Sequence, residues 1–401
     1  MDVLLEPRED TREANVRLNK QEFERRHTVL SSTPRLVTLG THNACNAKCI
    51  FCLEGKYSRF SLKIYKEFFE SKMGSTIRNA EKVTFTGFGE ILWVPGIEEF
   101  LDYINETLPN TWKIFTTNAT PLRPSVVERF LKSKYVIQAS VHASHAALHQ
   151  ELTQLENAFD TVVGNLQRLA DLRDERDLGR QLHIVLVNVL NAKNIEDLPE
   201  FLKLAWKLRV QEIRCFYMTL FVPDHIELSC FFDQEKANAS IRKAQEMSRV
   251  LAAGAGNLPQ PKAFQVNLPP LFDRTQKPSN GSHEICYDPW QHIYVELQGS
   301  VIPCCFWGEH IGNLTQGDEL DAIWNNEFYQ NLRRGMASGD PHPWCKSCIR
   351  YSGYNVDNIY CHLTNRPRQQ AVILREVLRR GLDAGPYFKA EDLGRLEASR
   401  I

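Results

Sequence analysis

Short runs of β-branched and aromatic residues alternate with longer amphipathic stretches from residue 35 onward. The short runs suit strands, and the longer stretches repeat their apolar residues at helical spacing. We expect strands at residues 35–40, 82–87, 113–118, 135–141, 182–190 and 212–218. We expect helices at residues 65–81, 94–108, 125–133, 159–175 and 196–209. Repeated βα units predict a parallel sheet covered by helices, and periodicity alone fits either an open doubly wound sheet or an incomplete barrel.

The division of the chain follows from where this pattern starts and stops. We expect an N-terminal helical extension at 1–34, a core at 35–225, a connecting helix and linker at 226–280, a cysteine-rich domain at 281–365 and a C-terminal helical tail at 366–401. Within the connector, a helix is predicted near 233–252. The cysteine-rich segment contains the hairpin sequence IYVELQGSVIP and one predicted helix near 318–336. Because this segment is too irregular to pack by an apolar core alone, a metal anchor is expected there.

Composition and charge narrow the class of protein. The 401 residues are 43% hydrophobic and 24% charged, with a net charge of -1, which is typical of a globular protein. This balance provides no basic surface for nucleic acid or for anionic membranes. The N-terminus has no apolar signal region, and no apolar run approaches the length of a membrane span. We therefore expect a cytoplasmic protein with no nucleic-acid or membrane partner.

Eleven cysteines are the main chemical signal. In a reducing cytosol clustered thiols indicate metal ligands rather than disulfides. The stretch CNAKCIFC places Cys45, Cys49 and Cys52 on one loop after the first expected strand. A structural zinc site needs four ligands, so zinc would require a further group such as His42. A [4Fe–4S] cluster with three thiolates instead leaves one iron open to a small molecule.

The CxxxCxxC spacing, with Phe51 before the third cysteine, resembles the radical S-adenosylmethionine (SAM) superfamily. The resemblance implies a partial (β/α)6 TIM-like barrel, a [4Fe–4S] cluster on the three cysteines, and SAM bound to the open iron. The sequence TGFGE at 86–90 resembles the family segment that holds the SAM amino group, through Gly87, Gly89 and Glu90. Ile91 replaces the proline that usually follows.

Further SAM contacts are implied by the same resemblance. The expected cofactor-binding residues beyond the TGFGE segment are Phe51, Thr117, Asn118, Ser140 and Asn188. His142 stands where many family members have aspartate. It is expected either to line the substrate pocket or to be a buried structural histidine.

A second cysteine set lies in the last third of the chain. The spacing Cys286-x12-Gly-x4-Cys304, followed by PWCKSC, resembles the auxiliary-cluster domain called SPASM, or its shorter twitch form. The longer form has a cysteine where this chain has Tyr354, so the twitch form is the better match. One [4Fe–4S] cluster is then implied, with the ligands Cys286, Cys304, Cys345 and Cys348. Cys305 and Cys361 remain as spare or substitute ligands, Cys361 leaves a two-cluster form open, and four thiolates would also suit zinc.

The family chemistry implies reductive cleavage of SAM to a 5′-deoxyadenosyl radical that abstracts hydrogen. An auxiliary cluster that can accept an electron favours an oxidative, dehydrogenase-like change in a small metabolite, such as an aminocyclitol or a sugar. A peptide-modifying maturase and a radical epimerase are alternatives, and the epimerase would use a hydrogen donor such as Cys215, although a buried cysteine is the simpler interpretation. A non-catalytic iron–sulfur or zinc protein is the alternative from another class. An external reductant such as flavodoxin or ferredoxin is an expected partner.

Overall fold

The computed structural model describes residues 11–42, 44–53, 66–87, 89–254, 264–275, 285–307, 309–346, 348 and 355–398. The six expected strands are present, each within one residue of its predicted ends. They are β1 (Leu36–Gly40), β2 (Lys82–Thr86), β3 (Trp112–Thr117), β4 (Tyr135–Ser140), β5 (Leu182–Leu190) and β6 (Glu212–Tyr217). They pair in parallel and in chain order, so the sequence pattern predicted the core of the sheet correctly.

Four further strands extend this sheet on both sides. β7 (Gln265–Asn267) pairs with β6, and β8 (His292–Val295) pairs in parallel with β1. β9 (Ser300–Ile302) and β10 (Gly312–Asn313) follow in antiparallel order, which gives a ten-stranded sheet. The predicted hairpin is therefore present as β8 and β9, and it continues the sheet of the core.

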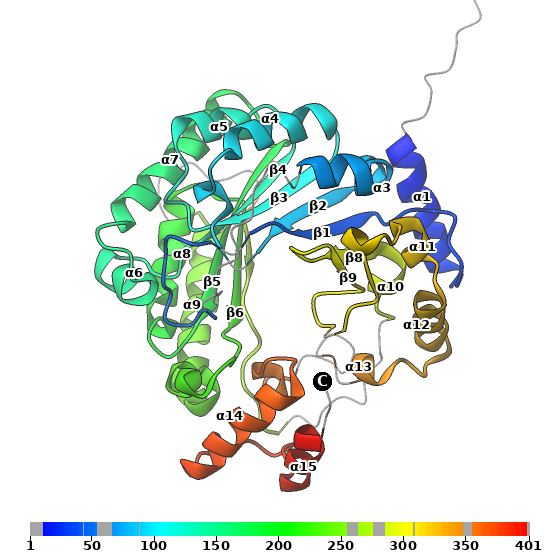
Figure 1. The fold of residues 1–401 in the computed structure, drawn as a ribbon. Helices are drawn as coiled ribbons and strands as arrows, with labels where there is room; N and C mark the ends of the chain where they lie inside the picture. The colour runs from blue at the N-terminus through cyan, green and yellow to red at the C-terminus, as the bar shows by residue number, and fades with distance from the viewer. Residues whose placement is uncertain are drawn as a thin grey trace, which may run out of the picture.

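Helices cover the outer side of the curved sheet, and its concave side faces the C-terminal third of the chain (Figure 1). The helices up to residue 252 are α1 (Thr11–Glu24), α3 (Gly74–Asn79), α4 (Ile97–Thr107), α5 (Pro124–Phe130), α6 (Ala146–Thr153), α7 (Phe159–Glu175), α8 (Leu198–Lys207) and α9 (Gln234–Ala252). A π-helical turn, η1 (Phe69–Met73), leads into α3, and short 3-10 turns are η2 (Ile91–Trp93), η3 (Ile195–Asp197), η4 (Pro223–Leu228) and η5 (Cys230–Phe232). The sequence pattern predicted these helices except α6.

The C-terminal third contains shorter helices. They are α10 (Asp288–Gln291), α11 (Leu320–Trp324), α12 (Glu327–Ser338), α13 (Pro343–Lys346), α14 (Pro367–Arg379) and α15 (Ala390–Ala398), with 3-10 turns η6 (Leu314–Gln316) and η7 (Ile359–His362). The single helix expected near 318–336 is wrong. Two helices form instead, because the side chain of Asn326 accepts a hydrogen bond from Tyr329 N at 2.9 Å and so caps a new helix.

The two faces of the sheet differ in chemistry. Phe115 of β3 packs against Phe130 of α5, with ring centroids 5.8 Å apart, so its face is the one covered by helices. On the opposite, concave face Thr116 donates a hydrogen bond to Gln138 at 3.3 Å. Phe216 is 45% exposed on that face. The concave wall thus carries polar groups beside apolar ones and is partly open, whereas the helix-covered face packs into the core.

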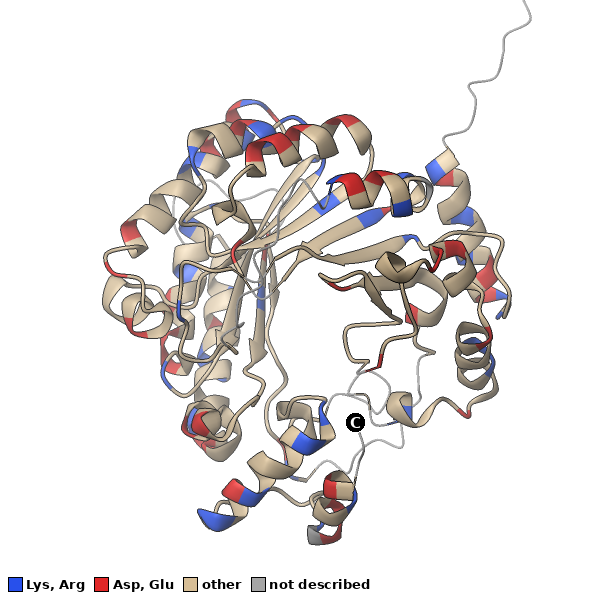
Figure 2. Ribbon diagram, viewed as in Figure 1, with Lys and Arg blue, Asp and Glu red and all other residues tan. Residues whose placement is uncertain are grey.

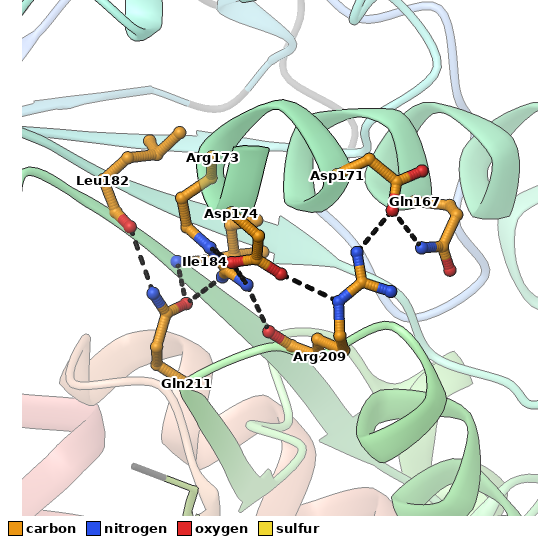
Figure 3. Close-up of polar contacts among 8 residues, drawn as sticks. All are labelled: Gln167, Asp171, Arg173, Asp174, Leu182, Ile184, Arg209 and Gln211. Atoms are coloured by element: carbon orange, nitrogen blue, oxygen red, sulfur yellow. Dashed lines mark hydrogen bonds and ion pairs between the residues drawn. The ribbon is translucent and has the colours of Figure 1, made fainter. Parts of the chain in front are cut away.

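Charged side chains lie mainly on the helices, and the strands carry few of them (Figure 2). A polar network also joins α7 to the N-terminal ends of β5 and β6 (Figure 3). There the buried Arg173 donates to Gln211 Oε1 at 2.8 Å and to Arg209 O at 3.0 Å. Gln211 in turn accepts from Ile184 N at 2.9 Å. This network fixes the N-terminal ends of β5 and β6. The predicted motifs follow the opposite, C-terminal ends of the strands.

Among the described residues, no helix is long and apolar enough to cross a membrane.

Candidate cofactor site

The first cysteine loop begins five residues after β1 and is held by backbone hydrogen bonds. Lys48 N donates to Thr153 O at 3.0 Å, and Ile50 N donates to Leu152 O at 2.9 Å, both at the end of α6. Cys52 N donates to Cys49 O at 3.0 Å, which turns the loop back on itself. Helix α6, which the sequence did not predict, therefore anchors the backbone of the loop that carries the three cysteines.

The glycine-containing turn after β2 packs directly on this loop. Glu90 N donates to Ala44 O at 2.8 Å. A Cβ atom on Gly87 would lie 2.0 Å from His42 O, and one on Gly89 would lie 2.3 Å from Ala44 O. No side chain fits at either distance, so both glycines are required by close contact of two backbones. Phe88, between them, lies outside the described residues.

The Glu90 carboxylate points into the protein and is 1% exposed. It accepts hydrogen bonds from Thr117 Oγ1 at 2.8 Å, from Asn118 N at 2.5 Å and from Leu92 N at 3.1 Å. Burial raises the pKa of Glu90 to about 7, and these three donors oppose that rise. The expected contact of Glu90 with the SAM amino group stays a prediction. In the structure Glu90, Thr117 and Asn118 form one unit that joins the ends of β2 and β3.

Asn46 links the cysteine loop to the same unit. Asn118 Nδ2 donates to Asn46 Oδ1 at 2.8 Å, and Asn46 Nδ2 donates to Thr120 Oγ1 at 2.9 Å. Thr120 Oγ1 donates to Asn118 Oδ1 at 2.6 Å and closes the ring of contacts. Asn46 and Thr120 were not predicted as site residues. Their only sequence signal is that each follows a strand end within a motif-bearing turn.

Phe51 of the cysteine loop packs against His142. Their ring centroids are 4.8 Å apart with the planes at 86°, an edge-to-face contact. Val189 N donates to His142 Nδ1 at 3.2 Å. Burial lowers the pKa of His142 to about 3, so the ring is neutral at physiological pH. This placement agrees with a buried structural histidine, one of the two roles expected for it.

Ser140 and Asn188 lie on opposite faces of the sheet. Ser140 is at the end of β4 on the concave face, in the same strand row as Gln138. Asn188 is buried on the helix-covered face, where its Oδ1 accepts from Asn194 Nδ2 at 3.0 Å. The structure therefore brings Ser140, but not Asn188, onto the concave wall.

Cys215 pairs with Asn188 across β5 and β6 and shares its face. It is buried in the apolar core, and this burial raises the pKa of its thiol to about 12. Its placement matches the buried cysteine that the sequence favoured. The alternative role as a hydrogen donor at the barrel mouth receives no support from this position.

The thiols of the first loop lie close enough to influence one another. Burial, with the neighbouring Cys52 and Cys45 adding to its effect, raises the pKa of Cys49 to about 12. Among the described residues, no three His, Cys, Asp or Glu side chains converge as the ligands of a single metal ion would. Three thiols on one loop are a suitable donor set for an iron–sulfur cluster, in which each thiolate would bind its own iron.

The second cysteine set surrounds one cavity. Cys286, Cys304, Cys345 and Cys348 all line it, and the space between its walls is about 510 Å³, including the part open to solvent. Burial raises the pKa of Cys345 to about 12, with Cys286, Cys348 and Asp288 adding to the rise. Four thiols facing one space are a suitable donor set for a closed iron–sulfur cluster.

The two spare cysteines lie near this cavity. Cys361 is close enough to Cys348 for the second thiol to add to the rise of its pKa, which burial raises to about 11. Cys305 is exposed, and it adds to the rise in the pKa of Tyr294 that burial causes. Neither residue lines the cavity itself, so the four predicted ligands are the ones that the structure brings together.

These features define a partial parallel barrel with one cysteine loop at the strand ends and a second cysteine site in a C-terminal domain. Residues 286–349 match the SPASM family, described as an iron–sulfur cluster-binding domain. The predicted SPASM-type auxiliary domain is thereby confirmed for this segment, and the mixed α/β core with its mostly parallel sheet agrees with the predicted fold class.

Several solved structures have a similar fold. Streptococcus suis SuiB is 15% identical, with a TM-score of 0.57 over 83% of this chain and 75% of that chain. SuiB bound to the precursor peptide SuiA is 17% identical, with a TM-score of 0.53 over 83% and 74% of the two chains. Native anSMEcpe with bound AdoMet and the Cp18Cys peptide is 15% identical, with a TM-score of 0.54 over 86% and 97%. Comparison with curated proteins gave no match.

Proposed function

We propose that this chain is a radical SAM enzyme that carries out an oxidative modification. The observation that supports this most strongly is the contrast between its two cysteine sites. Cys45, Cys49 and Cys52 form a three-thiol loop bound to the glycine turn, whereas the C-terminal domain has four thiols around one cavity. The first site would hold a cluster through three thiolates and leave one iron open to SAM, whereas the second offers a thiolate for each of four irons.

When bound, the open cluster and SAM would supply a 5′-deoxyadenosyl radical able to remove a hydrogen atom from the substrate. The residues of the chain would hold the cysteine loop in a fixed position for this chemistry. The contacts of Asn46, Asn118 and Glu90 fix the loop to the ends of β2 and β3. Gly87 and Gly89 allow the two turns to touch, and Ser140 offers a hydroxyl on the concave wall. The four thiols of the C-terminal site would hold the group that takes up the second electron of an oxidation.

We propose a small polar metabolite as the substrate. Support comes from the concave wall, where Thr116, Gln138 and Ser140 present hydroxyl and amide groups suited to a polyhydroxyl compound. A peptide is the second candidate. It is supported by the similar folds of SuiB with the SuiA peptide and of anSMEcpe with the Cp18Cys peptide.

Cleavage of SAM tests the proposed function directly. The anaerobically reconstituted and reduced protein should bind about eight irons and convert SAM to 5′-deoxyadenosine and methionine, detected by mass spectrometry. Replacing Cys45, Cys49 and Cys52 by Ala should remove about four irons and all cleavage. Cys230→Ala is the matched control, because Cys230 is a buried cysteine of η5 outside both sets, and this variant should keep its iron and its activity. A fully iron-loaded protein that never cleaves SAM would show that both cysteine sets are non-catalytic.

A further inference from the structure

Trp307 has a buried hydrogen-bond donor in the wall of the auxiliary cysteine cavity. The residue is 5% exposed and lines this cavity together with Cys286, Cys304, Cys345 and Cys348. Among the residues that the structure describes, no group accepts a hydrogen bond from its buried indole nitrogen, Nε1. Buried polar groups are nearly always paired, and an unpaired one calls for an explanation such as a bound ion or water molecule. A donor in the wall of a cysteine cavity therefore points to the group that the cysteines hold.

A short turn keeps Trp307 beside one of the cysteines. Strand β9 ends at Ile302, and Trp307 N donates a hydrogen bond to Cys304 O at 3.1 Å. Ile302, Trp307 and Leu332 form a small apolar cluster. Cys304 and Cys345 both pack against this cluster. The indole ring and two of the four thiols thus belong to one packed unit.

The aromatic neighbours of Trp307 provide no acceptor for its N–H. The ring of Phe328 meets it edge to face, with centroids 5.3 Å apart, and the ring of Trp344 stacks on it at 5.6 Å. The ring of His342 is also close, with centroids 4.7 Å apart. His342 Nδ1 accepts a hydrogen bond from Trp344 N at 3.3 Å, so the proton of this ring lies on Nε2, which is then a donor. These three side chains pack around the indole without pairing with its N–H.

Sulfur is the acceptor that the cavity can supply. Among the described side chains that pack on the same apolar cluster, Tyr294 has a hydroxyl group, and Cys304 and Cys345 have thiols. None of these groups accepts from Nε1 in the structure. Most other residues that line the cavity are apolar, namely Pro289, Pro303, Phe306, Leu332 and Met336. An iron–sulfur cluster on the four cysteines would bring further sulfur atoms into this space, and sulfur can accept a hydrogen bond.

A hydrogen bond of this kind has a predictable effect on an iron–sulfur cluster. Hydrogen bonds to the sulfur atoms are among the features that set its reduction potential. The reduced cluster has one more negative charge than the oxidised cluster, and an N–H group binds a more negative acceptor more strongly. The donor therefore stabilises the reduced form more than the oxidised form. In an apolar cavity this difference is weakly screened.

We propose that the indole N–H of Trp307 donates a hydrogen bond to a sulfur atom of the auxiliary cluster and so raises the reduction potential of that cluster. This inference rests on the proposed function, because it requires an iron–sulfur cluster on the four cysteines. In the proposed oxidation the substrate radical gives one electron to the oxidised cluster and one proton to solvent or a base. A higher potential favours this electron transfer. A one-electron carrier of the flavodoxin or ferredoxin class then takes the electron and restores the oxidised cluster.

The test measures the potential of the auxiliary cluster without SAM chemistry. All variants are made in the background Cys45→Ala, Cys49→Ala, Cys52→Ala, and the midpoint potential is followed by paramagnetic resonance during a redox titration. Trp307→Phe should shift the midpoint to a more negative value. Trp344→Phe is the matched control, because Trp344 lines the same cavity and stacks on Trp307. This control removes an equal part of a ring but keeps the Trp307 N–H, so its midpoint should stay close to that of the parent.

A second measurement detects the hydrogen bond itself. The protein is labelled with nitrogen-15 in its tryptophan indoles, and the reduced cluster is studied by pulsed paramagnetic resonance. The parent and Trp344→Phe should both show a nitrogen-15 coupling to the cluster. Trp307→Phe should lose this coupling.

Several results would overturn the inference. One is an iron-loaded Trp307→Phe variant with an unchanged or more positive midpoint, and another is an equal shift in Trp344→Phe. A parent without any nitrogen-15 coupling would show that water, and not a sulfur atom, accepts from Nε1. If Trp307→Phe fails to retain iron, benzothienylalanine in place of Trp307 removes the N–H while keeping the shape of the ring, and it should give the negative shift.

Loss of iron from the benzothienylalanine variant as well would assign Trp307 to holding the site rather than to tuning it, and would also overturn the inference. If the parent background binds no iron–sulfur cluster, the proposed function fails instead.

Discussion

The side-chain amine of Lys113 is buried between the sheet and the helices that cover it. It is 0% exposed, and its Nζ donates to Leu108 O at 2.7 Å, to Ser133 Oγ at 2.8 Å and to Thr111 O at 3.2 Å. Burial lowers the pKa of Lys113 to about 7, with the nearby Lys134 adding to the effect. The unfolded chain, with an ordinary lysine pKa, binds more protons than the folded chain between these two values. The free energy of unfolding should therefore rise as the pH increases from about 7 to about 10.5.

A Lys113→Met variant should lose this pH dependence. The wild-type protein should gain about 2–5 kcal/mol of stability between pH 7 and pH 10 from this one group, after allowance for the carbonyl groups that also stabilise the ammonium. Urea unfolding midpoints at several pH values measure the effect. Lys132→Met is the control, because Lys132 is exposed nearby, and it should follow the wild-type profile. Parallel profiles for wild type and Lys113→Met would show that the amine is not the group responsible.

The residues that hold the site were only partly predictable from the sequence. The cysteine and glycine motifs have fixed spacing, so Cys45, Cys49 and Glu90 could be recognised along the chain. Asn46 and Thr120 act through contacts between turns about 74 positions apart, and nothing in their local sequence indicates a partner. The face of the sheet on which a side chain lies could not be predicted from the sequence either. Asn188 and Ser140 both sit near strand ends, yet the pleat places them on opposite faces.

At the scale of elements, the turn after β2 and the cysteine loop behave as one unit. The strands of the core could be predicted to within a residue because short runs of β-branched and aromatic residues, separated by longer amphipathic stretches, mark strands. Helix α6 was missed because its sequence, AALHQELT, has only two leucines, which give too weak a helical pattern. Its role emerges only in three dimensions, where its last carbonyl groups receive the cysteine-loop amides.

Gly87→Ala should separate these two turns. The new Cβ would meet the carbonyl oxygen of His42, which is backbone and cannot move aside as a side chain can. We expect a stability loss of about 1–3 kcal/mol and reduced iron retention at the first cysteine loop. Iron analysis and thermal unfolding measure the two effects. Gly164→Ala is the control, because Gly164 lies within α7 with open space around it, and this change should stabilise the helix by about 0.5–1 kcal/mol. Normal iron content in Gly87→Ala would mean that the contact is not needed for the site.

At the scale of the whole molecule, the N-terminal segment, the core sheet and the cysteine domain are joined by long-range contacts. β8 pairs with β1 although more than 250 residues separate them, as the contact of Thr38 with His292 shows. The sequence marked a hairpin at this place but not its partner, because sheet pairing depends on the geometry of the complete fold. Trp290 makes a similar connection, since its Nε1 donates to His27 O at 2.7 Å.

Arg333 is the point where these parts meet, and it provides the last prediction. Its guanidinium is 0% exposed, lies 4.6 Å from the centroid of the Trp324 ring, and bonds to carbonyl groups of Thr28, Pro289 and Trp324. Arg333→Met should leave these buried acceptors without donors and cost about 3–5 kcal/mol. Because the bonds connect the N-terminal segment to the wall of the cysteine cavity, we expect faster amide hydrogen exchange at both α1 and α10, together with loss of auxiliary iron. Arg334→Met removes an exposed neighbour on the same helix and should change neither. Faster exchange confined to α12 would show that Arg333 stabilises only its own helix, and that another contact joins the N-terminal segment to the cysteine domain.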